Sequence, residues 1–98
     1  MMISYMMTLE AIEDYLENCV FYPTVKVHIA AGGDLSIKDF YVCEFGRKWT
    51  CTNYDYETRE ADFYNDDLKA YIHGVIKTKQ TYLGEVFNFA ISYVDSCI

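Results

Sequence analysis

The residues best suited to chemistry are the carboxylates and aromatic rings of residues 54–67, which stand close together in one stretch. This stretch has the sequence YDYETREADFYNDD, with six carboxylates, four aromatic rings and a single arginine. Carboxylates spread over a surface can imitate a row of phosphates, and neighbouring rings add contact area that charge alone lacks. The pattern therefore predicts a surface that binds a basic groove on another macromolecule.

Catalytic motifs give no comparable signal. The glycine pair at 32–33 is not followed by Lys-Ser or Lys-Thr, and the chain lacks Gly-x-Ser-x-Gly and His-Glu-x-x-His patterns. Asp39 with Glu44, or Glu57 with Asp62, could form an acid–base pair, but any acidic protein offers such pairs. We expect a protein that is not an enzyme, with a small metal- or thiol-dependent enzyme as the competing class.

Four cysteines are scattered along the chain without a Cys-x-x-Cys pattern or a short Cys/His spacing: Cys19, Cys43, Cys51 and Cys97. A zinc site built from them with His28 and His73 would need ligands from distant parts of the chain. Scattered cysteines in a cytosolic protein are typically reduced and pack as small core residues. We therefore expect no bound metal or cofactor.

The net charge of −7 is unevenly distributed. Residues 1–22 contain four acids and no base, residues 51–67 contain six acids and one arginine, and the segments between and after them are nearly balanced. Such acidic segments repel nucleic acid and anionic membranes and accelerate encounters with basic proteins. Direct nucleic-acid binding is not expected, since the eight basic residues do not cluster. Acidity that serves solubility alone remains the alternative.

Length and hydropathy indicate one domain spanning residues 1–98, with an apolar content of 52% that suffices for a modest core. No apolar stretch is long enough to span a membrane, and the N-terminal residues lack the features of a signal peptide. We expect a cytoplasmic protein, located in the host cytoplasm if a phage encodes it.

Thr8 is a suitable N-cap for a first helix whose apolar side carries Leu9, Ile12 and Leu16. The opposite side carries four carboxylates, Glu10, Glu13, Asp14 and Glu17. This side is either an ordinary solvated helix face or a second part of the partner-binding surface.

Three strands are expected to follow as an antiparallel meander. Residues 24–30 alternate between apolar and polar side chains, residues 31–34 form a turn, and a second strand extends from about 35 to 45. The alternation of this second strand changes phase near residues 39–40, which indicates a bulge or burial on both faces. A reversal at Gly46-Arg47 leads into the third strand, residues 48–53.

The second half is predicted to be mainly helical. Asn65 is a plausible N-cap for a helix beginning at Asp66 and Asp67, with an apolar side formed by Leu68, Tyr71, Ile72, Val75 and Ile76. Residues 82–98 fit both the alternation of a strand and the spacing of a helix. The helix is favoured because its spacing places every polar residue on one side. The expected class is α+β, with a three-stranded antiparallel sheet packed against two or three helices.

In size, acidity, clustering of tyrosines with acids in residues 54–67 and lack of enzymatic motifs, the chain resembles the small acidic inhibitors of bacteriophages and mobile elements, the anti-CRISPR and anti-restriction proteins. It is a resemblance of type. It implies a non-enzymatic inhibitor that binds the basic nucleic-acid-binding surface of a bacterial nuclease effector, with DNA mimicry as one route. Toxin-neutralising immunity proteins share the size and the acidity, and they are the alternative.

The partner is accordingly expected to be a basic protein, a nucleic-acid-guided or DNA-cleaving enzyme. The chain is expected to be a monomer or a homodimer, with Cys97-Ile98 available for a dimer contact. The predicted partner-binding residues are Tyr54, Asp55, Tyr56, Glu57, Glu60, Asp62 and Tyr64, together with Glu10, Glu13, Asp14 and Glu17.

Overall fold

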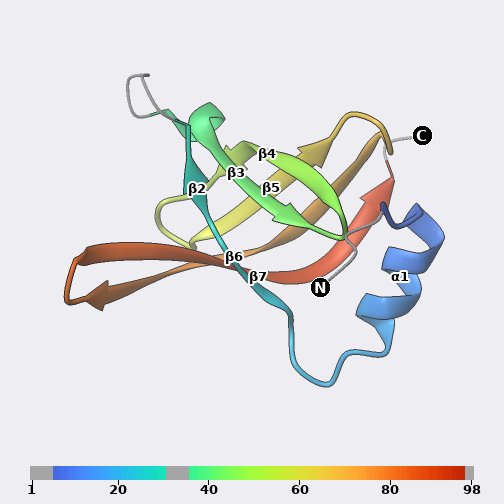
Figure 1. Cartoon of the computed structure of the whole chain (residues 1–98), viewed down its shortest axis with the longest axis horizontal. Coiled ribbons are helices and arrows are strands. Elements are labelled where there is room, and N and C mark those ends of the chain that lie inside the picture. Colours follow the sequence, from blue (N-terminus) through green and yellow to red (C-terminus); the bar gives the residue numbers. More distant parts are fainter. Residues whose placement is uncertain (1–5, 31–35, 97–98) are drawn as a thin grey trace.

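Seven antiparallel strands form one strongly curved sheet with the order β1-β7-β6-β5-β4-β3-β2 (Figure 1). The computed structural model describes residues 6–30 and 36–96. The strands are β1 (Thr24–Lys26), β2 (His28–Ile29), β3 (Phe40–Glu44), β4 (Arg47–Tyr54), β5 (Glu60–Asn65), β6 (Ala70–Thr81) and β7 (Gly84–Ser96). Helix α1 (Leu9–Glu17) precedes the sheet, and the 3-10 turn η1 (Ile37–Asp39) leads into β3.

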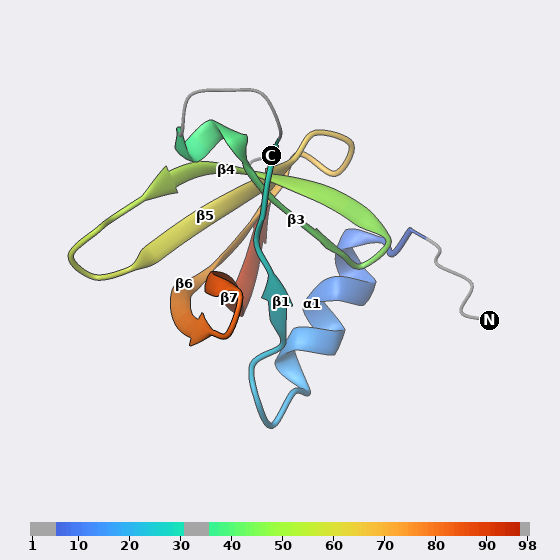
Figure 2. The same ribbon diagram turned by 60° about the vertical axis from the view of Figure 1, so that its left-hand side comes forward.

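The sheet comes close to closing into a barrel because one short segment pairs with both of its ends. Strand β1 pairs with β7 and strand β2 pairs with β3, and only Val27 separates the two. The Val27 amide donates a hydrogen bond of 2.9 Å to the carbonyl oxygen of Phe87. Figure 2 shows this segment crossing between β3 and the β6–β7 pair. Near-closure leaves little unpaired strand edge exposed.

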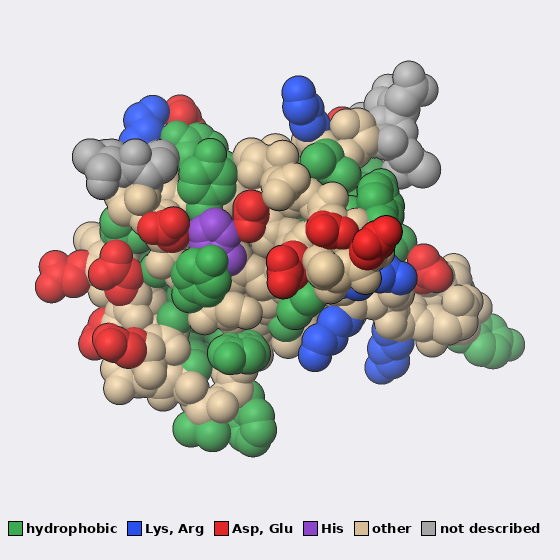
Figure 3. Space-filling model, turned by 180° about the vertical axis from the view of Figure 1, so that it is seen from behind, with side chains coloured by type: hydrophobic (Ala, Val, Ile, Leu, Met, Phe, Trp, Pro, Cys, Tyr) green, Lys and Arg blue, Asp and Glu red, His purple; other side chains and the backbone are tan. Residues whose placement is uncertain are grey.

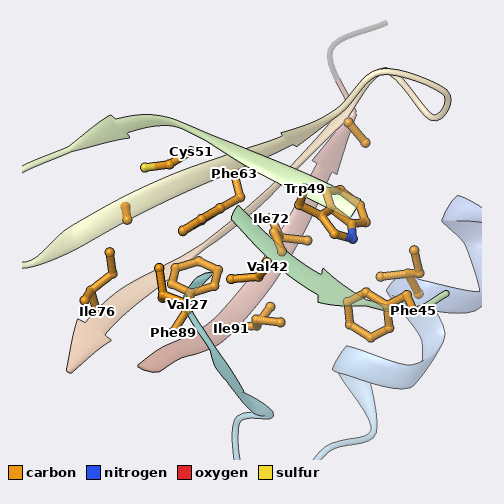
Figure 4. Close-up of a cluster of buried hydrophobic side chains, with 13 residues drawn as sticks. Val27, Val42, Phe45, Trp49, Cys51, Phe63, Ile72, Ile76, Phe89 and Ile91 are labelled. Atoms are coloured by element: carbon orange, nitrogen blue, oxygen red, sulfur yellow. The ribbon is translucent and has the colours of Figure 1, made fainter. Parts of the chain in front are cut away.

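The core fills the inside of this barrel and is mainly aromatic and β-branched (Figure 4). The rings of Phe63 and Phe89 lie 4.5 Å apart at its centre, and both side chains are fully buried. Trp49 is also buried, and its indole N–H donates to the carbonyl oxygen of Glu44 at 3.0 Å. Other buried members of the core are Val27, Val42, Phe45, Cys51, Ala61, Ala70, Ile72, Ile76 and Ile91.

Helix α1 forms as the sequence indicates. The Thr8 side chain caps it by accepting a hydrogen bond of 3.1 Å from the Ala11 amide. Ile12 is fully buried in the core, and Tyr15 contacts the ring of Phe45 at 5.9 Å. The helix therefore packs one side against the barrel and leaves the other in solvent. In the described part of the chain, no helix is long and apolar enough to cross a membrane.

The meander of residues 24–54 differs from the prediction in two places. The expected strand 24–30 is divided at Val27 into β1, which pairs with β7, and β2, which pairs with β3. The reversal between β3 and β4 occurs at Phe45 and Gly46, with φ angles of 59° and 69°, and β4 contains the predicted strand 48–53. The expected strand 35–45 instead begins with η1, capped reciprocally by Ser36 and Asp39. This turn, and not a bulge, causes the phase change near residue 39. The predicted turn at 31–34 falls outside the described residues.

The predicted α+β class is wrong: the chain is mostly β, since 57% of the described residues lie in strands and this part of the chain contains a single α-helix. The helix expected from Asp66 is a hairpin turn followed by β6. Asn65 is only 6% exposed; its side-chain oxygen accepts from the Leu68 amide at 2.9 Å, and its amide group donates to the Lys48 carbonyl at 3.0 Å. The cap-like signal of Asn65 therefore stabilises a turn between two strands.

The helix favoured for residues 82–98 is also wrong, because residues 84–96 form β7. His73 pairs with Tyr93 and Gly74 pairs with Ile91, so the ladder between β6 and β7 skips Ser92. This bulge shifts the strand alternation by one residue, and Phe89, Ile91 and Val94 all pack into or against the core. A strand with such a shift imitates helical spacing in the sequence.

Candidate protein-binding surface

The outer face of strands β5, β6 and β7 brings acids and aromatic rings together. Three side chains lie in one cross-strand row, Asp62, His73 and Tyr93, and three more in the next, Tyr64, Tyr71 and Asp95. Glu60, two residues before Asp62 on β5, extends the same face. We call these seven residues the acidic-aromatic face: Glu60, Asp62, Tyr64, Tyr71, His73, Tyr93 and Asp95.

Strand alternation explains why these side chains face outward. On β5 the residues between them, Ala61 and Phe63, are buried in the core, and on β6 Ile72 is buried in the same way. Neighbouring side chains of a strand point to opposite faces, so burial of one set exposes the other. The bulge at Ser92 restores this outward direction for Tyr93 and Asp95 after Ile91.

His73 is at the centre of the face and links its carboxylates. The imidazole Nδ1 lies 2.6 Å from an Asp62 carboxylate oxygen, and Nε2 lies 3.8 Å from an oxygen of Asp95. The ring stacks on Tyr93 with centroids 4.5 Å apart and is 6.0 Å from the ring of Tyr71. With 18% of its side chain exposed, His73 is held between rings and acids and fixes the orientation of Asp62.

Aromatic contacts continue around the outside of the barrel. Tyr64 and Tyr71 have ring centroids 4.9 Å apart, and Tyr41 stacks on His28 at 5.1 Å. The Lys48 ammonium lies 4.5 Å from the centroid of the Tyr41 ring. Many of the tyrosines are thus half-buried against neighbours on the outer surface.

A hollow of about 240 Å³ lies in the acidic-aromatic face. Figure 3 shows a histidine side chain among several carboxylates on this side of the molecule. Gly74 lies beneath the face, and a Cβ atom built on it would be 1.9 Å from the Ala90 carbonyl oxygen. The two strands approach too closely here for any side chain. The hollow is lined by Glu60, Asp62, His73, Gly74, Val75, Ser92 and Tyr93.

The residues predicted from the 54–67 run fall into two groups. Glu60, Asp62 and Tyr64 belong to the acidic-aromatic face. Tyr54, Asp55, Tyr56 and Glu57 instead lie in and next to the turn between β4 and β5.

Local structure accounts for two features of that turn. The Asp55 carboxylate accepts hydrogen bonds from the Glu57 amide at 2.9 Å and the Thr58 amide at 3.3 Å, which stabilises the turn. Tyr54 and Tyr56 have their rings 4.7 Å apart. Asp55 thus has a structural role that needs no partner.

The predicted helix acids also separate. Glu13 and Glu17 line a hollow between α1 and β7 of about 320 Å³, next to Tyr93. Glu10 and Asp14 line a different hollow, together with Thr8 and Ala11. Only the first pair therefore adjoins the acidic-aromatic face.

Four members of the face escaped the sequence prediction, Tyr71, His73, Tyr93 and Asp95. Their alternation with Ile72 and Val94 was the available signal. A helical assignment of both segments hides this signal, because these residues would not share one face of a helix.

The described cysteine thiols and possible metal ligands give little sign of a reactive site. Burial raises the pKa of the Cys51 thiol to about 11, so the thiol is protonated at neutral pH and is a poor nucleophile. Within residues 6–30 and 36–96, no group of three or more His, Cys, Asp or Glu side chains is placed to hold a metal ion. The described residues of the face thus combine carboxylates with stacked aromatic rings.

Comparisons with known proteins return no match: no protein-family model, no curated protein and no solved structure is significantly similar to this chain.

Proposed function

We propose that this protein is a non-enzymatic inhibitor that binds a basic surface of another protein through its acidic-aromatic face. The partner class that suits this face is an enzyme with a positively charged nucleic-acid groove, such as a nuclease effector. The observation that carries the proposal is the concentration of Glu60, Asp62 and Asp95 around a ring-stacked His73 on one side of the sheet.

The acids of this face have no lysine or arginine within the strand segments that form it. Residues 60–64, 71–75 and 90–96 contain no lysine or arginine. The acids of the adjoining turn differ, since Asp66 lies 3.1 Å from the Lys69 ammonium and Asp67 lies 3.7 Å from the Arg47 guanidinium. Negative charge is therefore left available at the face, where it can steer a basic partner toward the chain.

Spacing and rigidity favour the imitation of phosphates. Glu60 and Asp62 are two residues apart on one strand, which separates their Cα atoms by roughly 6–7 Å. Asp62 is held by His73, so part of the charge is fixed before binding. Tyr64, Tyr71 and Tyr93 supply rigid contact area of the kind that dominates binding energy at protein interfaces.

The proposal is tested by capture on the immobilised full-length chain from a lysate of its native host, with elution by a salt gradient. A triple variant, Glu60→Gln with Asp62→Asn and Asp95→Asn, removes three charges from the face. We expect its association rate with the captured partner to fall by about 10- to 100-fold at low salt, because steering depends on these charges. Nucleic acid added to the lysate should displace the partner.

A matched control removes three charges elsewhere, Glu10→Gln with Asp14→Asn and Glu57→Gln. It has the same net charge as the face variant and should bind nearly as the parent chain does. Equal loss in both variants would show that overall charge, not this face, drives binding. A captured partner that is acidic, or that nucleic acid does not displace, would contradict the nuclease-inhibitor proposal, and a secreted nuclease toxin would identify the immunity alternative.

A further inference from the structure

The β6–β7 hairpin projects beyond the barrel (Figure 1). Its end carries two exposed apolar side chains. Tyr82 and Leu83 form its two-residue turn and are 103% and 96% exposed. The turn is well defined, since the Thr81 hydroxyl donates to the Gly84 carbonyl at 2.6 Å and Gly84 has a φ of +126°. Nothing in the barrel packs on this tip, so the core does not explain its apolar character.

Basic residues accompany the tip. Lys77 and Lys79 are exposed on the same side of β6, and Lys26 lies across from Lys77, because both pair with Asn88. Within the hairpin arm, which we define as residues 77–86, Glu85 is the one acid. Figure 3 shows lysine and arginine side chains along the projecting part and a hydrophobic side chain at its end. The arm is basic and apolar, whereas the protein has a net charge of −7.

A hollow of matching chemistry exists at the other end of β7. This α1–β7 hollow, of about 320 Å³, is lined by Glu13, Leu16, Glu17, Ser92, Tyr93 and Val94. Leu16, Val94 and the Tyr93 ring offer apolar surface, and Glu13 and Glu17 supply two carboxylates one helical turn apart. The apolar tip of the arm thus matches the apolar surface of the hollow, and the lysines of the arm match the carboxylates of the hollow.

The arm cannot reach the hollow of its own chain. Leu83 and Ser92 are nine residues apart along the hairpin and β7, which corresponds to roughly 30 Å of strand. The arm is hydrogen-bonded along its length, from the Lys77–Asn88 pair to the Thr81–Gly84 pair, so it does not fold back. The complementary surfaces can meet only between two molecules.

We propose that the hairpin arm of one molecule docks into the α1–β7 hollow of a second copy of this chain. The contact is heterologous, since two different surfaces meet, so it generates rings or open chains and not a two-fold dimer. Its area is small, which makes the association weak, with dissociation constants on the order of 10–1,000 μM. The hollow adjoins the acidic-aromatic face at Tyr93. The inference stands independently of the proposed function.

Sedimentation velocity of the full chain, at protein concentrations of about 10 μM to 1 mM, measures this association. The average mass should increase with concentration and decrease with added salt, since the lysine–carboxylate contacts are screened. Two variants should each weaken association at least tenfold: Tyr82→Ser with Leu83→Ser, and Lys77→Glu with Lys79→Glu. Lys38→Glu with Lys48→Glu is the matched charge control and should associate nearly as well as the parent, because the two lysines lie outside the arm.

A charge exchange gives the sharpest result. Glu13→Lys with Glu17→Lys should weaken self-association at least tenfold, as the Lys77→Glu with Lys79→Glu variant does. Mixed together, these two proteins present acidic arms to basic hollows and basic arms to acidic hollows, so association should return. Circular dichroism and thermal melting establish that each variant is folded.

Three outcomes would overturn the proposal. The first is a parent chain that stays monomeric up to 1 mM at low salt, a range set by the weakness of so small an interface. The second is self-association that the arm substitutions leave unchanged, or a mixture that does not recover. The third is a monomer that binds vesicles of phosphatidylserine and phosphatidylcholine through Tyr82 and Leu83, which would assign the arm to a lipid surface.

Discussion

The barrel end and the free end of the β6–β7 hairpin are built from the same two strands but differ in what lies behind them. At the barrel end, Ile72, Ile91 and Phe89 are buried in the core, and the outer face carries acids and rings. At the free end, Thr78 is exposed where the alternation of β6 would otherwise place a core residue. The outermost turn then exposes Tyr82 and Leu83.

This difference separates residues that the fold requires from residues that it does not. Removing a buried residue of the barrel end disturbs packing, whereas Tyr82 or Leu83 can change without any effect on the core. The same distinction applies to the outer face, where Glu60 and Asp95 are exposed and contribute little to packing. Substitutions at the barrel end of the hairpin should therefore lower stability, whereas substitutions at its free end should affect binding alone.

The largest expected difference between the two ends concerns their glycines. Gly74→Ala places a Cβ atom 1.9 Å from the Ala90 carbonyl oxygen, so the backbones of β6 and β7 must separate. We expect the free energy of unfolding to fall by roughly 5 kcal/mol or more. Gly84→Ala meets no atom within 4 Å and should cost only about 1–3 kcal/mol, from its φ of +126°. Urea denaturation followed by circular dichroism measures both, and equal losses would contradict the comparison.

Aromatic side chains give the next contrast. Phe89→Ala removes a fully buried ring that contacts Phe63, and it should lower the free energy of unfolding by roughly 3–5 kcal/mol. Tyr82→Ala removes an exposed ring and should change it by less than about 0.5 kcal/mol. Thermal unfolding of the two variants checks this. A strongly destabilised Tyr82→Ala would show that the free end supports the barrel.

The smallest expected difference is in the thiol reactivity of two cysteines in the barrel wall, Cys43 and Cys51. Cys51 is buried, with its pKa raised from 9.0 to about 11, whereas Cys43 is exposed. At pH 8, a thiol reagent such as DTNB should modify Cys43 readily and Cys51 only on unfolding. Because the folded pKa is the higher one, the stabilisation from neutral Cys51 is complete below pH 9 and decreases as the pH rises from about 9 through 11.

Peptide mapping assigns the modified cysteine, and a Cys51→Ala variant is the control for the pH dependence. Between pH 9 and 11, the unfolding free energy of this variant should decrease by less than that of the parent chain. Rapid modification of Cys51 in the folded chain at pH 8 would contradict its burial.

Sequence reasoning succeeded where local signals are strong. Thr8 as an N-cap and the reversal at Gly46 both depend on neighbours within a few residues, and the structure confirms both. In the second half, periodicity predicted helices wrongly, because Asn65 resembles an N-cap and the bulge at Ser92 imitates helical spacing. The predicted face was correspondingly incomplete, with Asp62 identified and His73 not.

The amino-acid sequence by itself determined the acidity of the chain, its tyrosine-rich composition, the first helix and the early strands, since these depend on residue types and short-range preferences. Only the tertiary structure decided which acids lie together. Pairing of β5, β6 and β7 brings Asp62, His73 and Asp95 into contact across distances of 11 to 33 residues in sequence. Such long-range pairing depends on the burial of Phe63, Ile72 and Phe89 on the opposite face, and no local pattern specifies which strands pair.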